Sequence, residues 1–200
     1  MARQSAGAPL TPGLRNFPPG WLVVAALTLS IVLFFSMIWG PLAELRRIAG
    51  GLDPFDMRPG GYGLEEARAL LAALGTEGRA YYASTQLEVD TLYPLTYALS
   101  RGLLLLWLAL PGRASSSGFS ARVKPALLVA PIAACLFDWA ENQGIATMLA
   151  SGTDVSPAAV ARASLCTVAK SAASTVTECL CLALLASGLW RWLLRRRAGA

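Results

Sequence analysis

Long apolar runs separated by shorter polar stretches dominate the chain. A transmembrane helix needs about 20 consecutive, mostly apolar residues, and four regions of the sequence meet this description. We expect membrane spans at about residues 21–40, 88–110, 125–150 and 165–192. The pattern predicts an all-α, polytopic transmembrane helix bundle, with residues 1–200 forming a single integral membrane domain.

The segment between the first two spans has a helical pattern of its own. Its apolar residues recur at positions 64, 67, 70, 71 and 74, the spacing of one helix face. Glu65 and Glu66 lie in the first turn, where the helix dipole favours anions, and Gly75 follows as a typical C-cap. We therefore expect a short amphipathic helix at about residues 64–75, lying on the outer face of the bundle.

Composition supports a membrane protein and excludes several kinds of chemistry. Only 14% of the residues are charged, whereas soluble domains carry about 25%. The chain has no histidine, which excludes Ser-His-Asp and Cys-His catalysis and histidine-ligated zinc or haem. The four cysteines lie in apolar runs without CxxC spacing. We expect neither a metal nor a cofactor.

The distribution of basic residues predicts the orientation of the spans. The N-terminal tail, the 101–124 connection and the C-terminal end together hold ten basic residues and no acidic residue. The opposite side, residues 41–80 and 151–163, holds six arginines and seven acidic residues. An excess of lysine and arginine marks the cytoplasmic side, so both termini are expected there. The C-terminal WRWLLRRR is then expected to contact lipid headgroups, and no nucleic-acid partner is expected.

Three of the predicted spans carry polar stripes at helical spacing. DWAEN places Asp138, Glu141 and Asn142 on one face of the third span. The second and fourth spans have longer stripes, respectively Gln86, Asp90, Tyr93, Tyr97 and Arg101, and Lys170, Ser171, Ser174, Thr177, Glu178 and Cys181. Charged groups are costly at membrane depth, so we expect the stripes to face one another around a polar pocket that opens to the outer face.

Acid–base chemistry is the function that these residue types favour. Asp138 and Glu141, one turn apart, interact as like charges and can share a proton, as a general acid or base requires. Lys170 can neutralise one of them, donate a hydrogen bond or, if deprotonated, act as a nucleophile. The candidate catalytic residues are Asp138, Glu141, Asn142, Lys170 and Asp90, and the candidate ligand-binding residues are Arg79, Tyr82, Gln86, Tyr93, Tyr97, Ser174 and Glu178.

Three segments together resemble a known group of proteins. FDMRPGGYGLEEARALLAALGTEGRAYYASTQLEVDTLYPLTYAL, FDWAENQGIATML and the lysine of TVAKSAAS are similar to the pattern of a family of small, uncharacterised bacterial four-span membrane proteins. The resemblance covers about 110 of the 200 residues. It implies four spans in a bacterial inner (plasma) membrane but no reaction, and it places Arg79 and Tyr82 beside Asp90, with Arg79 at the mouth of the pocket.

Three functions from different classes fit these observations. The first is a membrane enzyme, of isomerase, cyclase or hydrolase type, that acts on a lipophilic small molecule. The second is an accessory subunit of a membrane complex whose buried charges lock the bundle. The third is a ligand-binding or transport protein, which would need to oligomerise. The apolar cytoplasmic halves of the third and fourth spans, ALLVAPIAAC and CLCLALLASGLW, count against transport.

Overall fold

Helices make up nearly all of the structure, a computed structural model that describes residues 17–115, 119–120 and 123–198. Four long helices are joined by shorter ones, and within these ranges the only β-type pairing is an isolated bridge between Pro111 and Ser115. In chain order the elements are α1 (Gly20–Trp39), α2 (Pro41–Ile48), the 3-10 turn η2 (Phe55–Met57), α3 (Leu64–Tyr81), the π-helical turn η3 (Tyr82–Gln86), α4 (Leu87–Leu108), α5 (Val123–Ala126), α6 (Val129–Ser151), the 3-10 turn η4 (Gly152–Asp154) and α7 (Pro157–Ala198).

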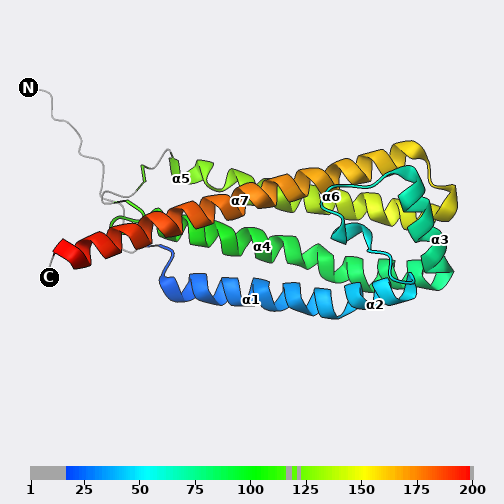
Figure 1. The fold of residues 1–200 in the computed structure, drawn as a ribbon, viewed down its shortest axis with the longest axis horizontal. Helices are drawn as coiled ribbons and strands as arrows, with labels where there is room; N and C mark the ends of the chain where they lie inside the picture. Colours follow the sequence, from blue (N-terminus) through cyan, green and yellow to red (C-terminus); the bar gives the residue numbers. More distant parts are fainter. Residues whose placement is uncertain (1–16, 116–118, 121–122, 199–200) are drawn as a thin grey trace, which may run out of the picture.

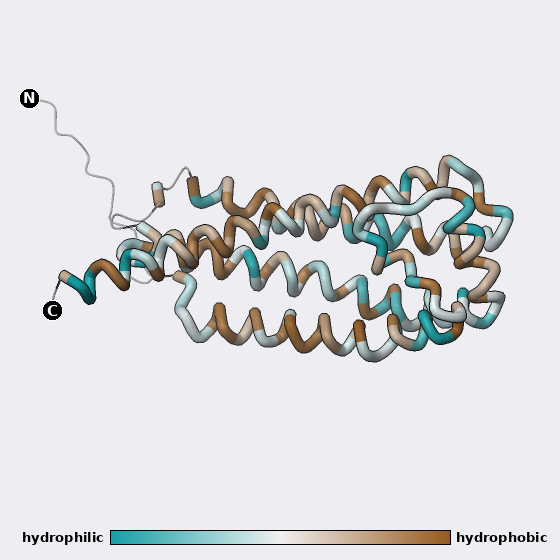
Figure 2. The backbone as a smooth tube through the Cα atoms, viewed as in Figure 1, coloured by the Kyte–Doolittle hydropathy of each residue, from teal (hydrophilic) through white to brown (hydrophobic). Residues whose placement is uncertain are grey.

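Three helical segments are long and apolar enough to cross a membrane, as in a membrane protein. They are Gly20–Ile48, Val123–Asp154 and Pro157–Ala198. Figure 2 shows hydrophobic residues along nearly the whole of α1, and hydrophilic ones concentrated at the two ends of the bundle. Helix α4 is not one of the three, because Asp90, Pro94 and Arg101 interrupt its apolar sequence.

The long helices α1, α4, α6 and α7 run side by side along the long axis of the molecule (Figure 1). Helices α6 and α7 share the largest interface, and α4 packs against α1, α6 and α7. Helices α2 and α3 gather at the end where α6 turns into α7, which we call the loop end. The other end, with the start of α1 and the C-terminus, is the terminal end.

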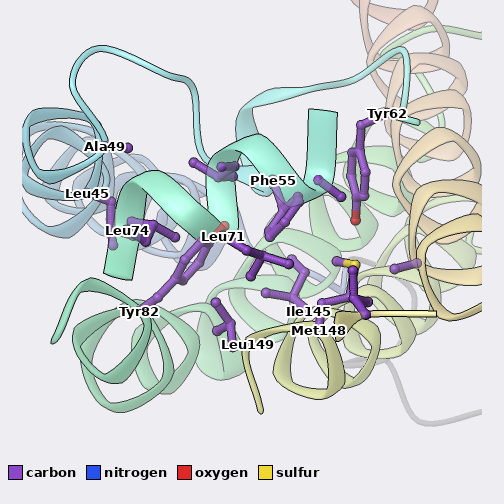
Figure 3. Close-up of a cluster of buried hydrophobic side chains, with 14 of the residues drawn as sticks. Leu45, Ala49, Phe55, Tyr62, Leu71, Leu74, Tyr82, Ile145, Met148 and Leu149 are labelled. Carbon is purple, nitrogen blue, oxygen red and sulfur yellow. The ribbon is translucent and has the colours of Figure 1, made fainter. Parts of the chain in front are cut away.

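A hydrophobic core fills the loop end (Figure 3). Leu71 from α3, Phe55 from η2 and Ile145 from α6 have no exposed surface there, and Tyr82 lies among them. The apolar stripe expected on the loop helix is part of this core, since Ala67, Leu70, Leu71 and Leu74 are all buried. The core fixes η2 and α3 across the loop end.

Helix α3 is longer than the 64–75 segment that the sequence predicts. Gly75 adopts φ +60° and breaks the regular helix, as its predicted capping role requires, but helical structure resumes at once and reaches Tyr81. Gly78 then allows close contact with α2, because a Cβ there would lie 2.8 Å from the Ile48 Cγ2 atom. The chain needs no turn after Gly75, since it continues through η3 directly into α4.

One other helix start differs from the predicted span boundaries. Helix α6 begins at Val129 and not near residue 125, and α5 precedes it as a separate turn. Helix α7 begins at Pro157, two turns before the span expected at 165–192, as the apolar pattern from about residue 158 predicts. The Ser156 Oγ atom accepts a hydrogen bond from the Ala159 N–H, and proline suits the first helical position. The basic residues Arg3, Arg15 and Arg122, used to predict the orientation, lie outside the described residues.

Candidate functional site

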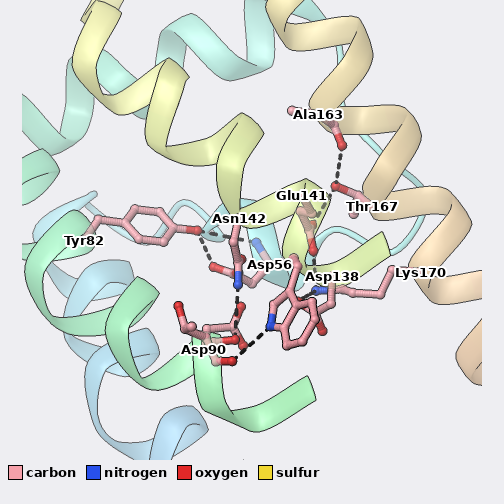
Figure 4. A network of polar contacts seen from close by, with 11 residues as sticks. Asp56, Tyr82, Asp90, Asp138, Glu141, Asn142, Ala163, Thr167 and Lys170 are labelled. Carbon is pink, nitrogen blue, oxygen red and sulfur yellow. Dashed lines mark hydrogen bonds and ion pairs between the residues drawn. The ribbon is translucent and has the colours of Figure 1, made fainter. Parts of the chain in front are cut away.

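Lys170 of α7 reaches between two acidic residues of α6. Its Nζ atom lies 3.3 Å from the Asp138 Oδ1 atom and forms a second ion pair with Glu141. The Thr167 hydroxyl donates a hydrogen bond of 2.6 Å to the other Glu141 oxygen (Figure 4). Asp138 and Glu141 of α6 thus face Thr167 and Lys170 of α7. Lys170 finds both of its anionic partners, and Glu141 both of its polar partners, on the opposite helix.

Two side chains of α6 bind the backbone of α4. The Asn142 Nδ2 atom donates to the Asp90 carbonyl at 3.1 Å, and the Trp139 indole N–H donates to the Thr91 carbonyl at 3.0 Å. Both carbonyls lie just before Pro94 in α4. These bonds hold the Asp90 turn of α4 against the DWAEN face of α6 (Figure 4).

The loop end contributes a residue that the sequence analysis missed. Asp56 of η2 accepts a hydrogen bond from the hydroxyl of Tyr82, which has no exposed surface. Burial, followed by the nearby Asp56 charge, raises the pKa of Tyr82, so the phenol stays a donor. Phe55 could have indicated this position from the sequence. An aromatic residue inside a turn-rich loop indicates that the loop packs onto the core, and Asp56 follows Phe55 directly.

A second ion pair lies further toward the terminal end. The Arg101 Nε atom of α4 is 2.7 Å from the Glu178 Oε1 atom of α7, and the guanidinium carbon lies 5.1 Å from the centre of the Tyr97 ring. The Tyr97 hydroxyl donates to the Ser174 carbonyl at 3.4 Å. The polar stripes of α4 and α7 therefore face each other, as the spacing predicts.

A cavity of about 380 Å³ lies among the four long helices. Its polar walls include Asp90, Asp138 and Lys170, whereas Glu141 and Asn142 are not among its lining residues. The complete lining comprises Ser30, Ile31, Phe34, Met37 and Ile38 of α1; Leu42 of α2; Asp56 and Met57 of η2; Asp90, Tyr93, Pro94, Tyr97 and Arg101 of α4; Ala134, Cys135 and Asp138 of α6; and Lys170, Ser171, Ser174 and Glu178 of α7.

The α1 side of the cavity is only loosely closed. Helix α1 lines the cavity together with α6 and α7, yet among the described residues it makes no extended contact with either of them. Ile31 and Phe34 on the α1 wall are 47% and 41% exposed. The sequence predicts an opening at the outer face; Asp56 and Met57 of η2 line the cavity at the loop end, and Met57 is 42% exposed. The α1 side is therefore a candidate route between the cavity and the surroundings of the helices.

Most of the predicted site residues lie in this region, but their positions differ. Besides Asp90, Asp138 and Lys170, four predicted ligand-binding residues line the cavity: Tyr93, Tyr97, Ser174 and Glu178. Tyr82 reaches the site only through Asp56. Gln86 is fully buried outside the lining, and its side-chain amide has no hydrogen-bond partner among the described residues. Arg79 lies against Gly152, directly after α6, and is not among the residues that line the cavity.

Carboxyl groups outnumber the cations around the Lys170 cluster. Asp56, Asp90, Asp138 and Glu141 surround one ammonium group (Figure 4), so full ionisation would leave three uncompensated negative charges in a buried site. Like charges at close range oppose one another's ionisation. The cluster is therefore suited to hold exchangeable protons. Within the described residues, no group of three or more acidic or cysteine side chains has an arrangement that could hold a metal ion.

Comparison of the chain with family models, curated proteins and solved structures finds no match. The geometry of the site therefore carries the functional argument.

Proposed function

We propose that the chain crosses the bacterial inner membrane four times, with α4 as the fourth span and both termini cytoplasmic. Helix α4 has 22 residues, which rise about 33 Å and suffice for a hydrocarbon core of about 30 Å. Two of its three charged residues, Asp90 and Arg101, line the cavity, and the third, Glu88, is exposed in the first turn. The excess of basic residues at the terminal end supports the orientation.

We further propose that the protein is a membrane enzyme that transfers protons on a lipophilic small molecule. One observation carries this proposal: Asp90 of α4 and Asp138 of α6 line the same cavity, whose α1 wall is mainly apolar. A volume of about 380 Å³ is within the range of small-molecule sites. Convergent acids beside an apolar wall suit a substrate that is mostly hydrocarbon and has one reactive polar or unsaturated group.

The ion pairs distinguish the roles of the two acids. Lys170 compensates the charge of Asp138 when Asp138 is a carboxylate, which suits a general base. Among the described residues Asp90 has no cationic partner and its Oδ2 atom has no hydrogen bond, which suits a general acid. In an isomerisation, Asp90 would give its proton to one carbon of a double bond, while Asp138 removes a proton from a neighbouring carbon. The electron pair of that C–H bond forms the new double bond, and no oxidant or cofactor is consumed.

Glu141 and Asn142 support the site without lining it. Glu141 holds Lys170 from behind, and Asn142 holds the Asp90 turn of α4. We therefore assign them positioning roles and keep the proton transfer for Asp90 and Asp138.

A structural lock in an accessory subunit is the second candidate, favoured by the double ion pair of Lys170. A buried charge that loses its partner is strongly destabilising, so such pairs hold helices in register even where no chemistry occurs. Transport has less support, because the apolar cluster of Leu105, Ala109, Leu127 and Cys181 closes the bundle near the terminal end. The polar cavity is then a dead end and not a path.

A carboxyl-specific reagent tests the enzymatic proposal without a known substrate. N,N′-Dicyclohexylcarbodiimide partitions into lipid, where a protonated carboxyl adds across its C=N bond and gives a stable N-acylurea. We expect the protein in phosphatidylcholine nanodiscs to be modified at Asp90 at neutral pH, as read by peptide mass spectrometry. Asp90→Asn should abolish the modification with little change in melting temperature, and Glu88→Gln, at an exposed position of the same helix, should leave it intact.

Two results would contradict the enzymatic proposal. The first is the absence of any adduct on Asp90 or Asp138. The second is a large loss of thermal stability in both Asp90→Asn and Asp138→Asn, because it would show that the carboxylates serve the fold alone.

A further inference from the structure

We propose that the molecule bound in the cavity is an amine-bearing amphiphile, which enters from the α1 side and places its ammonium group against Asp90 and Asp56. This inference rests on the cavity of the proposed function and names the chemical class of its ligand.

Unsatisfied acceptors mark the position of the head group. The Asp90 Oδ2 and Asp56 Oδ1 atoms are buried without hydrogen-bond partners in the structure, although both side chains line the cavity. Asp90 is only 2% exposed, so water does not compensate it freely. An ammonium group offers several N–H donors and a positive charge. It would form an ion pair with the Asp56 carboxylate and donate a hydrogen bond to the carbonyl oxygen of the protonated Asp90, so both oxygens are satisfied and the excess of negative charge falls.

The cations of the cavity are already occupied. Lys170 is held by Asp138 and Glu141, and Arg101 is held by Glu178. An anionic head group would have to displace one of these carboxylates and would also approach Asp90. The charges that line the cavity therefore select against carboxylate or phosphate heads and favour a cationic one.

The α1 wall accounts for the hydrocarbon part of the ligand. Ile31, Phe34, Met37 and Ile38 line the α1 side of the cavity, and Ile31 and Phe34 are also partly exposed. The hydrocarbon chain of the ligand, lying along these residues, would bury apolar surface while its far end remains in contact with lipid. The head would lie at the loop end, because Asp90 is in the first turn of α4 and Asp56 is in η2.

The test uses four probes that separate charge from chain length. Dodecylamine carries both features, dodecanol lacks the charge, dodecanoate reverses it, and butylamine lacks the long chain. Each is added to the protein in phosphatidylcholine nanodiscs, and two independent readouts are taken: the melting temperature and the rate of carbodiimide modification at Asp90. We expect dodecylamine alone to raise the melting temperature and to slow the modification.

Variants locate the head group. Asp56→Asn should weaken dodecylamine binding about tenfold or more, because it replaces a hydrogen bond to a charged group by a neutral one. Asp90→Asn should weaken it in the same direction, while the exposed Glu88→Gln leaves it unchanged. Equal effects of dodecylamine and dodecanol would overturn the amine assignment, and equal effects of butylamine and dodecylamine would overturn the lipid route and leave a small soluble amine.

The outcomes also separate this inference from the proposed function. If the carbodiimide modifies Asp90 but no amine slows it or raises the melting temperature, the ligand class is wrong and the proton-transfer proposal stands. If no carboxyl is modified but dodecylamine still raises the melting temperature through Asp90, the proton-transfer proposal fails and the ligand class stands.

Discussion

Asn142 of α6 donates its side-chain hydrogen bond to the Asp90 carbonyl, the one backbone acceptor in α4 that Pro94 cannot serve. In a regular α-helix the carbonyl of residue 90 accepts from the N–H of residue 94, and proline has none. The side chain of a neighbouring helix therefore replaces a missing intrahelical bond. Because the carbonyl belongs to Asp90, the same contact sets where the Asp90 turn lies relative to the cavity.

Removing the Asn142 hydrogen bond should destabilise the protein unless Pro94 is also replaced. We expect Asn142→Leu to lower stability by about 1–3 kcal/mol, since it leaves a buried carbonyl unpaired. Adding Pro94→Ala restores an N–H at residue 94 and should recover much of the loss. Thermal melting in detergent measures both, with Gln143→Leu at an exposed position as the control. A loss that persists in the double variant would show that Asn142 acts elsewhere.

The Lys170 ion pairs should behave as a coupled unit. Lys170→Met leaves Asp138 and Glu141 without their cation, so we expect a loss of about 3–5 kcal/mol. Glu141→Gln should cost less, because Lys170 keeps Asp138. The double variant Lys170→Met with Glu141→Gln should be more stable than Lys170→Met alone. Arg162→Met, at an exposed position of α7, is the matched control, and strictly additive losses would refute the coupling.

Close packing of α6 against α7 depends on a glycine. A Cβ at Gly144 would lie 2.7 Å from the Ala163 Cβ, so Gly144→Ala should push the helices apart and cost about 1–3 kcal/mol. Combining it with Ala163→Gly should restore stability. Gly60→Ala, where a Cβ would meet nothing within 4 Å, should have little effect. Denaturation monitored by circular dichroism is a suitable measurement; equal losses at Gly144 and Gly60 would argue against close packing.

Single cysteines should report the orientation. In a background with the four native cysteines replaced by alanine, Gly60→Cys should react with an impermeant maleimide in intact cells. Ser120→Cys should react only after the cells are opened, since the basic terminal end is expected to face the cytoplasm. Both positions are exposed in the structure. The reverse labelling pattern would invert the orientation.

Periodicity alone predicted the long helices and the facing of the polar stripes. Asp90, Asp138 and Lys170 could be placed together because charges at helical spacing in apolar segments have few other places to go. It could not show that Glu141 and Asn142 lie behind the cavity wall. That difference depends on how α6 packs against α4 and α7, which the spacing of residues along one helix does not specify.

Contacts between distant segments were the part that the sequence could not provide. Asp56 lies far from Tyr82 along the chain, and only the folding of η2 onto the loop-end core brings them together. The resemblance placed Arg79 beside Asp90, whereas the structure places it against Gly152. A shared sequence pattern does not specify which distant segment a side chain contacts.

The π-helical turn η3 also limits which length changes the chain can tolerate. A turn with one additional residue shifts the angular phase of everything after it by about 100° relative to an uninterrupted α-helix. Deleting one residue within 83–85 would regularise the hydrogen bonding there, yet it would turn Asp90 and Arg101 out of the bundle or force α3 off its core. Homologues with this architecture should therefore keep the spacing between the two glycines of α3 and Asp90, even where the residues of the turn itself vary.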